Sequence, residues 1–148
     1  MSARKRALSS LTFFGLLLSV TVAWAIGFEI GQSKEELELK YEISVVDHGT
    51  GRVTVNLVIA DEGKLKPLDS VDLVISSEDG TTRPDLSVSL ATRKEDGKLR
   101  VRAHMKKELA ERAQLQLKTG TNPRTGKPAL LAWFYYPISV AELIKKQK

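Results

Sequence analysis

The sequence of 148 residues contains no cysteine. The chain therefore has no disulfide, no thiol nucleophile, no thiolate ligand for a metal and no sulfur to which a lipid can be attached. Its stability must come from packing alone. A single domain of about 120 residues is long enough to bury such a core.

Negative charge is absent from the first 28 residues. That stretch has three basic residues at positions 4–6, an apolar run over residues 11–28, and small residues at Ala23 and Ala25. A positive start, an apolar middle and a small-x-small exit are the parts of a secretory signal. Residues 1–25 are therefore predicted to be a signal peptide cleaved after Ala25 or an uncleaved membrane anchor, because an apolar run of 18 residues just spans a hydrocarbon core of about 30 Å.

Either fate exports the remainder of the chain, so we expect a periplasmic or extracellular protein, anchored if the N-terminal segment is retained. Beyond Ala25 the chain has 20 of its 23 basic residues and all 18 acidic ones, a net charge of +2. This balance argues against a nucleic-acid partner, which requires a concentrated basic face. Contact with a membrane is predicted only through the N-terminal segment, if it is uncleaved.

Apolar and polar residues alternate with a period of two through most of the remaining sequence. Polar residues 29–36 predict a linker, and seven strands follow, separated by turns with Gly and Asp. These strands cover residues 37–45, 53–59, 71–75, 86–90, 99–105, 115–117 and 129–136. Residues 106–112 predict one or two helical turns, and Ser139 followed by Glu142 is typical of a capped helix over residues 139–148.

Residues 37–138 are thus predicted to form one all-β domain, an antiparallel two-sheet sandwich of about seven strands. The pattern resembles an immunoglobulin or fibronectin type III module at the level of the fold only. The cysteine pair of antibody domains is missing, and Trp133 lies on the last predicted strand. A closed barrel is the alternative architecture.

Aromatic residues are rare, and four of the five beyond residue 36 are consecutive. They are Trp133, Phe134, Tyr135 and Tyr136. Neighbouring residues of a strand face opposite sides, so one pair is expected in the core and the other is either covered or exposed. An exposed pair would form a binding surface, with Arg124 and Lys127 of the preceding loop as its polar rim.

The remaining polar residues form no catalytic or metal-binding motif. The two histidines, His48 and His104, are too few for a zinc site, and the acidic turns lack the spacing of a calcium loop. We therefore predict no catalytic residue, no metal and no cofactor. Arg100, Arg102 and His104 share one strand face, which would meet an anionic polymer or lipid headgroups, or be a solvated face paired with acidic neighbours.

These features predict a non-catalytic module, exported or membrane-tethered, that serves protein interaction or envelope structure. Its partner is expected to be a protein or an envelope polymer. Two alternatives stay open. One is a carbohydrate-binding module that uses the aromatic run at residues 133–136, and the other is an envelope enzyme or assembly factor with an unrecognised site.

Overall fold

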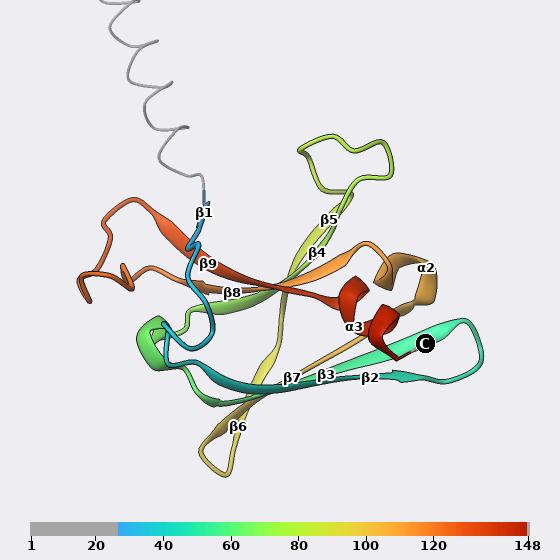
Figure 1. Cartoon of the computed structure of the whole chain (residues 1–148), viewed down its shortest axis with the longest axis horizontal. Helices are drawn as coiled ribbons and strands as arrows, with labels where there is room; N and C mark the ends of the chain where they lie inside the picture. Colours follow the sequence, from blue (N-terminus) through green and yellow to red (C-terminus); the bar gives the residue numbers. More distant parts are fainter. Residues whose placement is uncertain (1–26, 148) are drawn as a thin grey trace, which may run out of the picture.

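The computed structural model describes residues 27–147, which form two β-sheets packed face to face (Figure 1). The five-stranded sheet has the order β1-β9-β8-β4-β5, and the four-stranded sheet has the order β2-β3-β7-β6. The all-β sandwich expected from the sequence is therefore confirmed. The predicted signal peptide or anchor, with its cleavage site at Ala23 and Ala25, lies outside the described residues. Within residues 27–147, no helix has the length and apolar character that a membrane crossing requires.

The strands of the five-stranded sheet are β1 (Gly27–Glu29), β9 (Trp133–Ser139), β8 (Ala113–Thr119), β4 (Ser70–Ile75) and β5 (Leu86–Leu90). Those of the four-stranded sheet are β2 (Lys40–Asp47), β3 (Arg52–Asp61), β7 (Lys98–Lys106) and β6 (Thr92–Glu95). Three short helices connect or follow the strands: η1 (Gly63–Leu65), α2 (Lys107–Ala110) and α3 (Val140–Lys146). All strand pairs are antiparallel except β1 with β9, which is parallel.

The core lies between the sheets and is filled by every second residue of the central strands. Leu57 and Ile59 of β3 and Leu115 and Leu117 of β8 belong to this core, and all four side chains are almost completely buried. On β8 the intervening residues Gln114, Gln116 and Lys118 are polar and only partly buried, as the period-two pattern predicts. Burying these side chains is the main stabilising contribution available to a domain without disulfides.

The structure has nine strands among the described residues, two more than the seven predicted. Strand β6 escaped prediction because all four of its side chains are exposed, which leaves no apolar alternation to read. Strand β1 was assigned to the end of the apolar run and the start of the linker. The first predicted strand also begins later than expected, at Lys40, because residues 37–39 belong to a turn.

Residues 29–36, predicted to be a linker, are an integral part of the domain. Ser33 and Glu36 exchange reciprocal hydrogen bonds, with Ser33 N donating to Glu36 Oε2 at 3.0 Å and Glu36 N donating to Ser33 Oγ at 3.1 Å. Leu37, which follows this turn, is fully buried, and its carbonyl accepts a hydrogen bond from Lys64 N. Gly63 permits this close approach, because a Cβ there would collide with the backbone of Leu37.

The C-terminal helix α3 packs against β8 of one sheet and β2 of the other, beside one end of the sandwich (Figure 1). Ser139 is its N-cap, as predicted, and its Oγ accepts a hydrogen bond from Glu142 N at 3.3 Å. Val140 and Ile144, on the inner face of the helix, are buried. Gln147, which follows the helix, donates a hydrogen bond to the carbonyl of Val45. The helix therefore covers part of the core between the two sheets.

Candidate functional site

The aromatic run lies on β9, where its four side chains divide between the two faces of the sheet. Phe134 and Tyr136 face the core, and the ring of Tyr136 meets that of Tyr41 edge to face, with centroids 6.2 Å apart. Burial and the hydrogen bond with Tyr136 raise the pKa of Tyr41. Trp133 and Tyr135 point to the opposite face. The run is therefore not a single binding platform.

Of the four aromatic side chains, only Trp133 is extensively exposed, at 46%. The ring of Tyr135 is half-buried and lies against Gly27, the residue at which β1 begins. The ring of Trp133 reaches toward Gly120, which starts the preceding loop between β8 and β9. The outward aromatic pair is thus partly covered by β1 and by the loop before β9.

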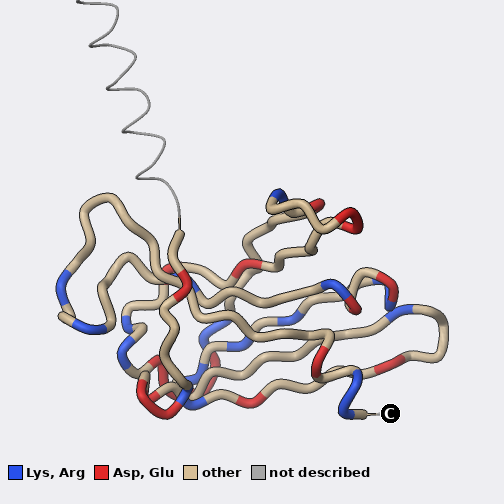
Figure 2. Tube along the Cα trace, turned by 45° about the horizontal axis from the view of Figure 1, so that its top comes forward, with Lys and Arg blue, Asp and Glu red and all other residues tan. Residues whose placement is uncertain are grey.

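That loop spans residues 120–132 and contains the predicted polar rim. Its base is closed by the bridge between Thr121 and Pro128, and by the hydrogen bond from Asn122 N to the carbonyl of Lys127 at 2.9 Å. Arg124 and Lys127 are both exposed, and Figure 2 shows the basic residues at the outer tip of the loop. The structure therefore places them on the same side of the domain as Trp133.

Three exposed apolar residues near Trp133 were missed by the sequence analysis. Leu130 and Leu131 precede β9 in the chain, and Phe28 lies on β1, which pairs with β9. The two leucines were assigned to a strand beginning at residue 129. Strand β9 instead begins at Trp133, which leaves both leucines in the loop.

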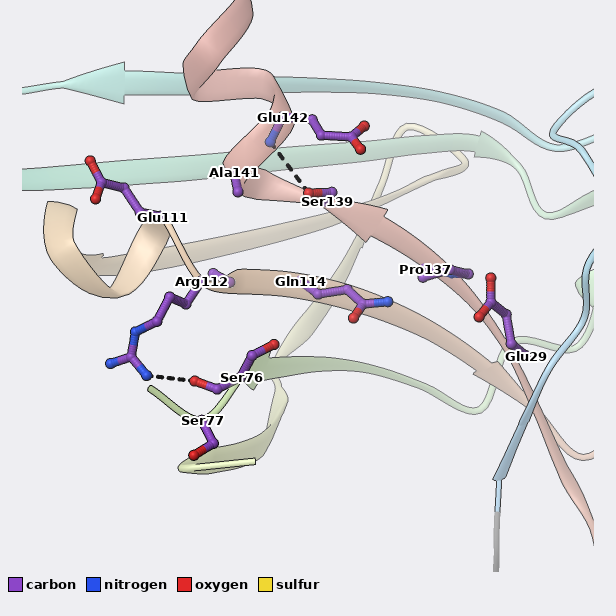
Figure 3. Close-up of a pocket in the computed structure, with 11 residues that line it drawn as sticks. Glu29, Ser76, Ser77, Glu111, Arg112, Gln114, Pro137, Ser139, Ala141 and Glu142 are labelled. Atoms are coloured by element: carbon purple, nitrogen blue, oxygen red, sulfur yellow. Dashed lines mark hydrogen bonds between the residues drawn. The ribbon is translucent and has the colours of Figure 1, made fainter. Parts of the chain in front are cut away.

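A polar pocket of about 580 Å³ lies near the start of α3 (Figure 3). It is lined by Ser76, Ser77, Arg112 and Ser139, together with residues of the α2–β8 turn. The guanidinium of Arg112 has three acceptors: it donates to the carbonyl of Ser76 and forms ion pairs with the carboxylates of Glu78 and Asp85. Arg112 therefore fastens the β4–β5 loop to the sandwich.

The serine hydroxyls of this pocket lack a histidine that would act as their base. Both histidines of the chain lie on the four-stranded side, where His48 follows β2 and His104 belongs to β7. There they bracket the hydroxyl of Thr54, with His48 Nε2 at 2.7 Å and His104 Nδ1 at 2.8 Å from its Oγ1. Since Thr54 is buried, this chain of hydrogen bonds braces the β2–β3 turn against β7.

The acidic turns use their carboxylates locally. Asp61 Oδ1 accepts from Gly63 N at 2.9 Å, and Asp79 Oδ1 accepts from Thr81 N at 3.0 Å. Hydrogen bonds from Ser77 and Thr81 hold the pKa of Asp79 below its usual value. Among residues 27–147, no three His, Asp or Glu side chains converge as a metal site would require.

The outer face of the four-stranded sheet has a row of positively charged side chains. Strand β7 alternates buried apolar residues with exposed polar ones, so its outward residues form one row. The row consists of Lys98, Arg100, Arg102, His104 and Lys106. Register adds two more cations, because Arg93 of β6 lies opposite Arg100 and Arg52 of β3 lies opposite Lys106. We call these seven residues the basic face.

A groove of about 620 Å³ lies in the middle of the basic face. Arg102 Nε donates to Asn56 Oδ1 at 3.0 Å, and Arg100 pairs with Glu95 at 3.2 Å. These contacts hold two guanidinium groups along the groove while leaving both side chains exposed. Ser44 and Arg93 complete its polar lining. The sequence had identified only Arg100, Arg102 and His104 of this face.

Comparison of the chain with protein-family models, curated proteins and solved structures finds no match in any of the three.

Proposed function

We propose that this protein is a non-catalytic binding module, exported or membrane-tethered, whose basic face binds a linear anionic polymer of the cell envelope. The observation that carries the proposal is the row of cationic side chains on β7. Four residues of that row and two cross-strand neighbours are Lys or Arg. Two acidic side chains, Glu42 and Glu95, share this face. Of the two, Glu95 forms an ion pair with a residue of the basic face, Arg100.

The geometry of the basic face favours an extended ligand over a compact one. Side chains on one face of a strand repeat every two residues, or about 6.7 Å, so the row from Lys98 to Lys106 offers positive charge over roughly 27 Å. The groove that crosses it is lined by three arginines, Arg93, Arg100 and Arg102. Such a surface suits a chain of carboxylate or phosphate groups lying along β7, with arginine forks able to bind two oxygens at once.

We further propose that the domain is an immunoglobulin-like Greek key. The order β2-β3-β7-β6 corresponds to the strands A-B-E-D of an immunoglobulin domain, and β9-β8-β4-β5 corresponds to G-F-C-C′. This correspondence supports a binding role by analogy, because the same fold is used for recognition in many unrelated proteins. The separation of both histidines from the serine-lined pocket also favours binding over hydrolysis.

The proposal is tested with the full-length chain in a neutral detergent, using immobilised heparin as a linear anionic probe and dextran as the uncharged control. The Arg100→Gln/Arg102→Gln variant should bind heparin at least about tenfold more weakly, as expected when two charge-assisted contacts are lost. The matched control is Lys145→Gln/Lys146→Gln, which removes the same charge from α3. It should bind as the wild type does.

Equal loss of binding in both variants would show that net charge alone matters and would contradict the proposal. Absence of heparin binding by the wild-type chain at low salt would do the same. Preference for poly-L-glutamate over heparin would replace the polymer with an acidic peptide segment. Circular dichroism of each variant checks that the fold is retained, so that a loss of binding reports on the face.

A further inference from the structure

We infer that Phe28, Leu130, Leu131 and Trp133 form a membrane patch that rests in the headgroup region of the bilayer holding the N-terminal segment. Their side chains are 53%, 94%, 58% and 46% exposed, respectively. The inference rests on the membrane-tethered form of the proposed function. It adds a second contact with lipid, made by the folded domain itself.

Strand pairing places the patch beside the point where the N-terminal segment joins the domain. In the β1–β9 ladder, Gly27 lies opposite Trp133, and Phe28 lies opposite Phe134. Phe28 and Trp133 therefore point to opposite faces of the sheet, but both lie at the end of the ladder nearest residue 26. Because the two strands are parallel, the chain that precedes Trp133 leaves the ladder on the same side as the chain that precedes Gly27. Leu130 and Leu131 therefore lie on the side from which residue 26 arrives.

The length of the N-terminal segment would place the β1–β9 ladder directly beside the membrane. Residues 7–26 are 20 consecutive uncharged residues. As a helix they would extend about 30 Å, which equals the thickness of a hydrocarbon core. Gly27 then lies at the membrane boundary. Trp133, on a neighbouring strand about 4.8 Å away, lies at a similar depth.

The chemistry of the patch matches the boundary between acyl chains and headgroups. Tryptophan is enriched at that depth because its ring is apolar and its indole N–H is polar. Arg124 and Lys127 extend from the same loop, and neither forms an ion pair within the described part of the chain. Such cations favour anionic headgroups. Glu29, the acidic residue of β1, lies at the end of that strand farther from Gly27.

The cysteine-free sequence permits a direct test with single labelled positions. The full-length Leu131→Cys chain, labelled with an environment-sensitive fluorophore, is reconstituted into vesicles of phosphatidylcholine and phosphatidylglycerol. Thr50→Cys is the matched control, in the β2–β3 turn at the opposite end of the sandwich from the loop of residues 120–132 (Figure 1). We expect the label at position 131 to emit at shorter wavelength and to be quenched several-fold less by iodide than the label at position 50.

A second measurement uses the natural fluorophore of the patch. In a Trp24→Phe background, brominated lipids should quench Trp133, and a Leu130→Ser/Leu131→Ser chain should lose most of this quenching. If residue 131 is as accessible to iodide as residue 50, and Trp133 is not quenched, the membrane patch does not exist. Protection of residue 131 that appears in detergent and disappears on dilution would instead assign the patch to a second copy of the chain.

The two proposals fail separately. Heparin binding does not involve the patch, so the Leu130→Ser/Leu131→Ser chain should retain it. If the label at position 131 is protected from iodide but the chain does not bind heparin, only the proposal for the basic face is contradicted. If the chain binds heparin but the label at position 131 is accessible to iodide, only the proposal for the membrane patch is contradicted.

Discussion

At the scale of the residue, the most consequential charged group is Asp72, which is buried on β4. Its Oδ2 lies 2.6 Å from Lys118 Nζ of β8, and its Oδ1 accepts a hydrogen bond from Ser89 of β5 at 2.7 Å. Burial acts to raise the pKa of Asp72. The hydrogen bonds with Lys118 and Ser89 and the charge of Lys118 outweigh burial, so the pKa lies below its usual value.

This lowered pKa predicts how stability depends on pH. A carboxyl whose pKa is lower in the folded state stabilises the fold above its unfolded pKa of about 3.9, and this contribution is lost as pH falls through the folded pKa. The Asp72→Asn variant should lose about 1–3 kcal/mol of unfolding free energy at pH 7, with a smaller difference from wild type at low pH. Urea denaturation between pH 2 and pH 7 measures this.

The control for this prediction is Asp47→Asn. Asp47 pairs with Lys107 at 2.6 Å, but both side chains are exposed to solvent. Solvent and salt screen such a pair, so its removal should leave the melting temperature nearly unchanged. Equal effects at the two positions would mean that burial of Asp72 adds nothing to the strength of its pairing.

At the scale of the element, period-two alternation predicted the strands whose two faces differ in burial. Strands β3, β4 and β7 were predicted for this reason, and the N-cap at Ser139 predicted α3. The alternation also predicted β5 with its observed bounds, Leu86–Leu90, but it did not reveal that Leu86 and Val88 are 45% and 43% exposed. Strand β5 is the edge of its sheet, and Figure 1 shows it extending away from the opposite sheet. A sequence pattern marks which side of a strand is apolar, but it carries no information on how far the facing sheet reaches.

The burial of β3 predicts a large difference between two neighbouring strands. Leu57→Ala should lower the free energy of unfolding by about 2–4 kcal/mol, because it leaves a cavity in the centre of the core. Val46→Ala on β2 is the control, since Val46 is 45% exposed, and it should cost about 0.5 kcal/mol or less. Thermal denaturation of both variants measures the difference. A melting temperature unchanged by Leu57→Ala would contradict the assignment of that face to the core.

The candidate sites were only partly predictable, for a related reason. Alternation on β7 was enough to place Arg100, Arg102 and His104 on one face. Adding Arg52 and Arg93 required the register of β3 and β6, and sequence separation hides which strands are neighbours. Aromatic composition identified Trp133. Phe28 is more than 100 positions away in the sequence, and only the parallel ladder brings it to the same end of β9 as Trp133.

At the scale of the whole molecule, the two proposed surfaces face in different directions. The basic face is the outer surface of the four-stranded sheet, whereas β1 and the loop of residues 120–132 belong to the five-stranded side (Figure 1). A domain resting on the membrane through its patch would therefore present the basic face away from the lipid. The patch would set the orientation in which a polymer is met.

This orientation predicts a contrast between two labels in the same vesicles. A label at Ser44→Cys, in the groove of the basic face, should stay open to iodide quenching in the reconstituted full-length chain. A label at Leu131→Cys should be protected. Quenching of both in detergent micelles is the reference state. Protection of Ser44→Cys by vesicles without added polymer would mean that the basic face itself lies on the lipid.

The parallel pairing of β1 with β9 also has a mechanical consequence. Tension between a bound polymer and a membrane anchor would reach the domain through residue 26 and act along β1. The ladder from Gly27 to Glu29, extended by the hydrogen bond from Ile30 N to the carbonyl of Tyr135 at 3.1 Å, would bear that tension in shear. Bonds loaded in shear must break together, whereas bonds that are peeled break one at a time. The three-residue strand that the sequence concealed would thus be the clamp that transmits force into the sandwich.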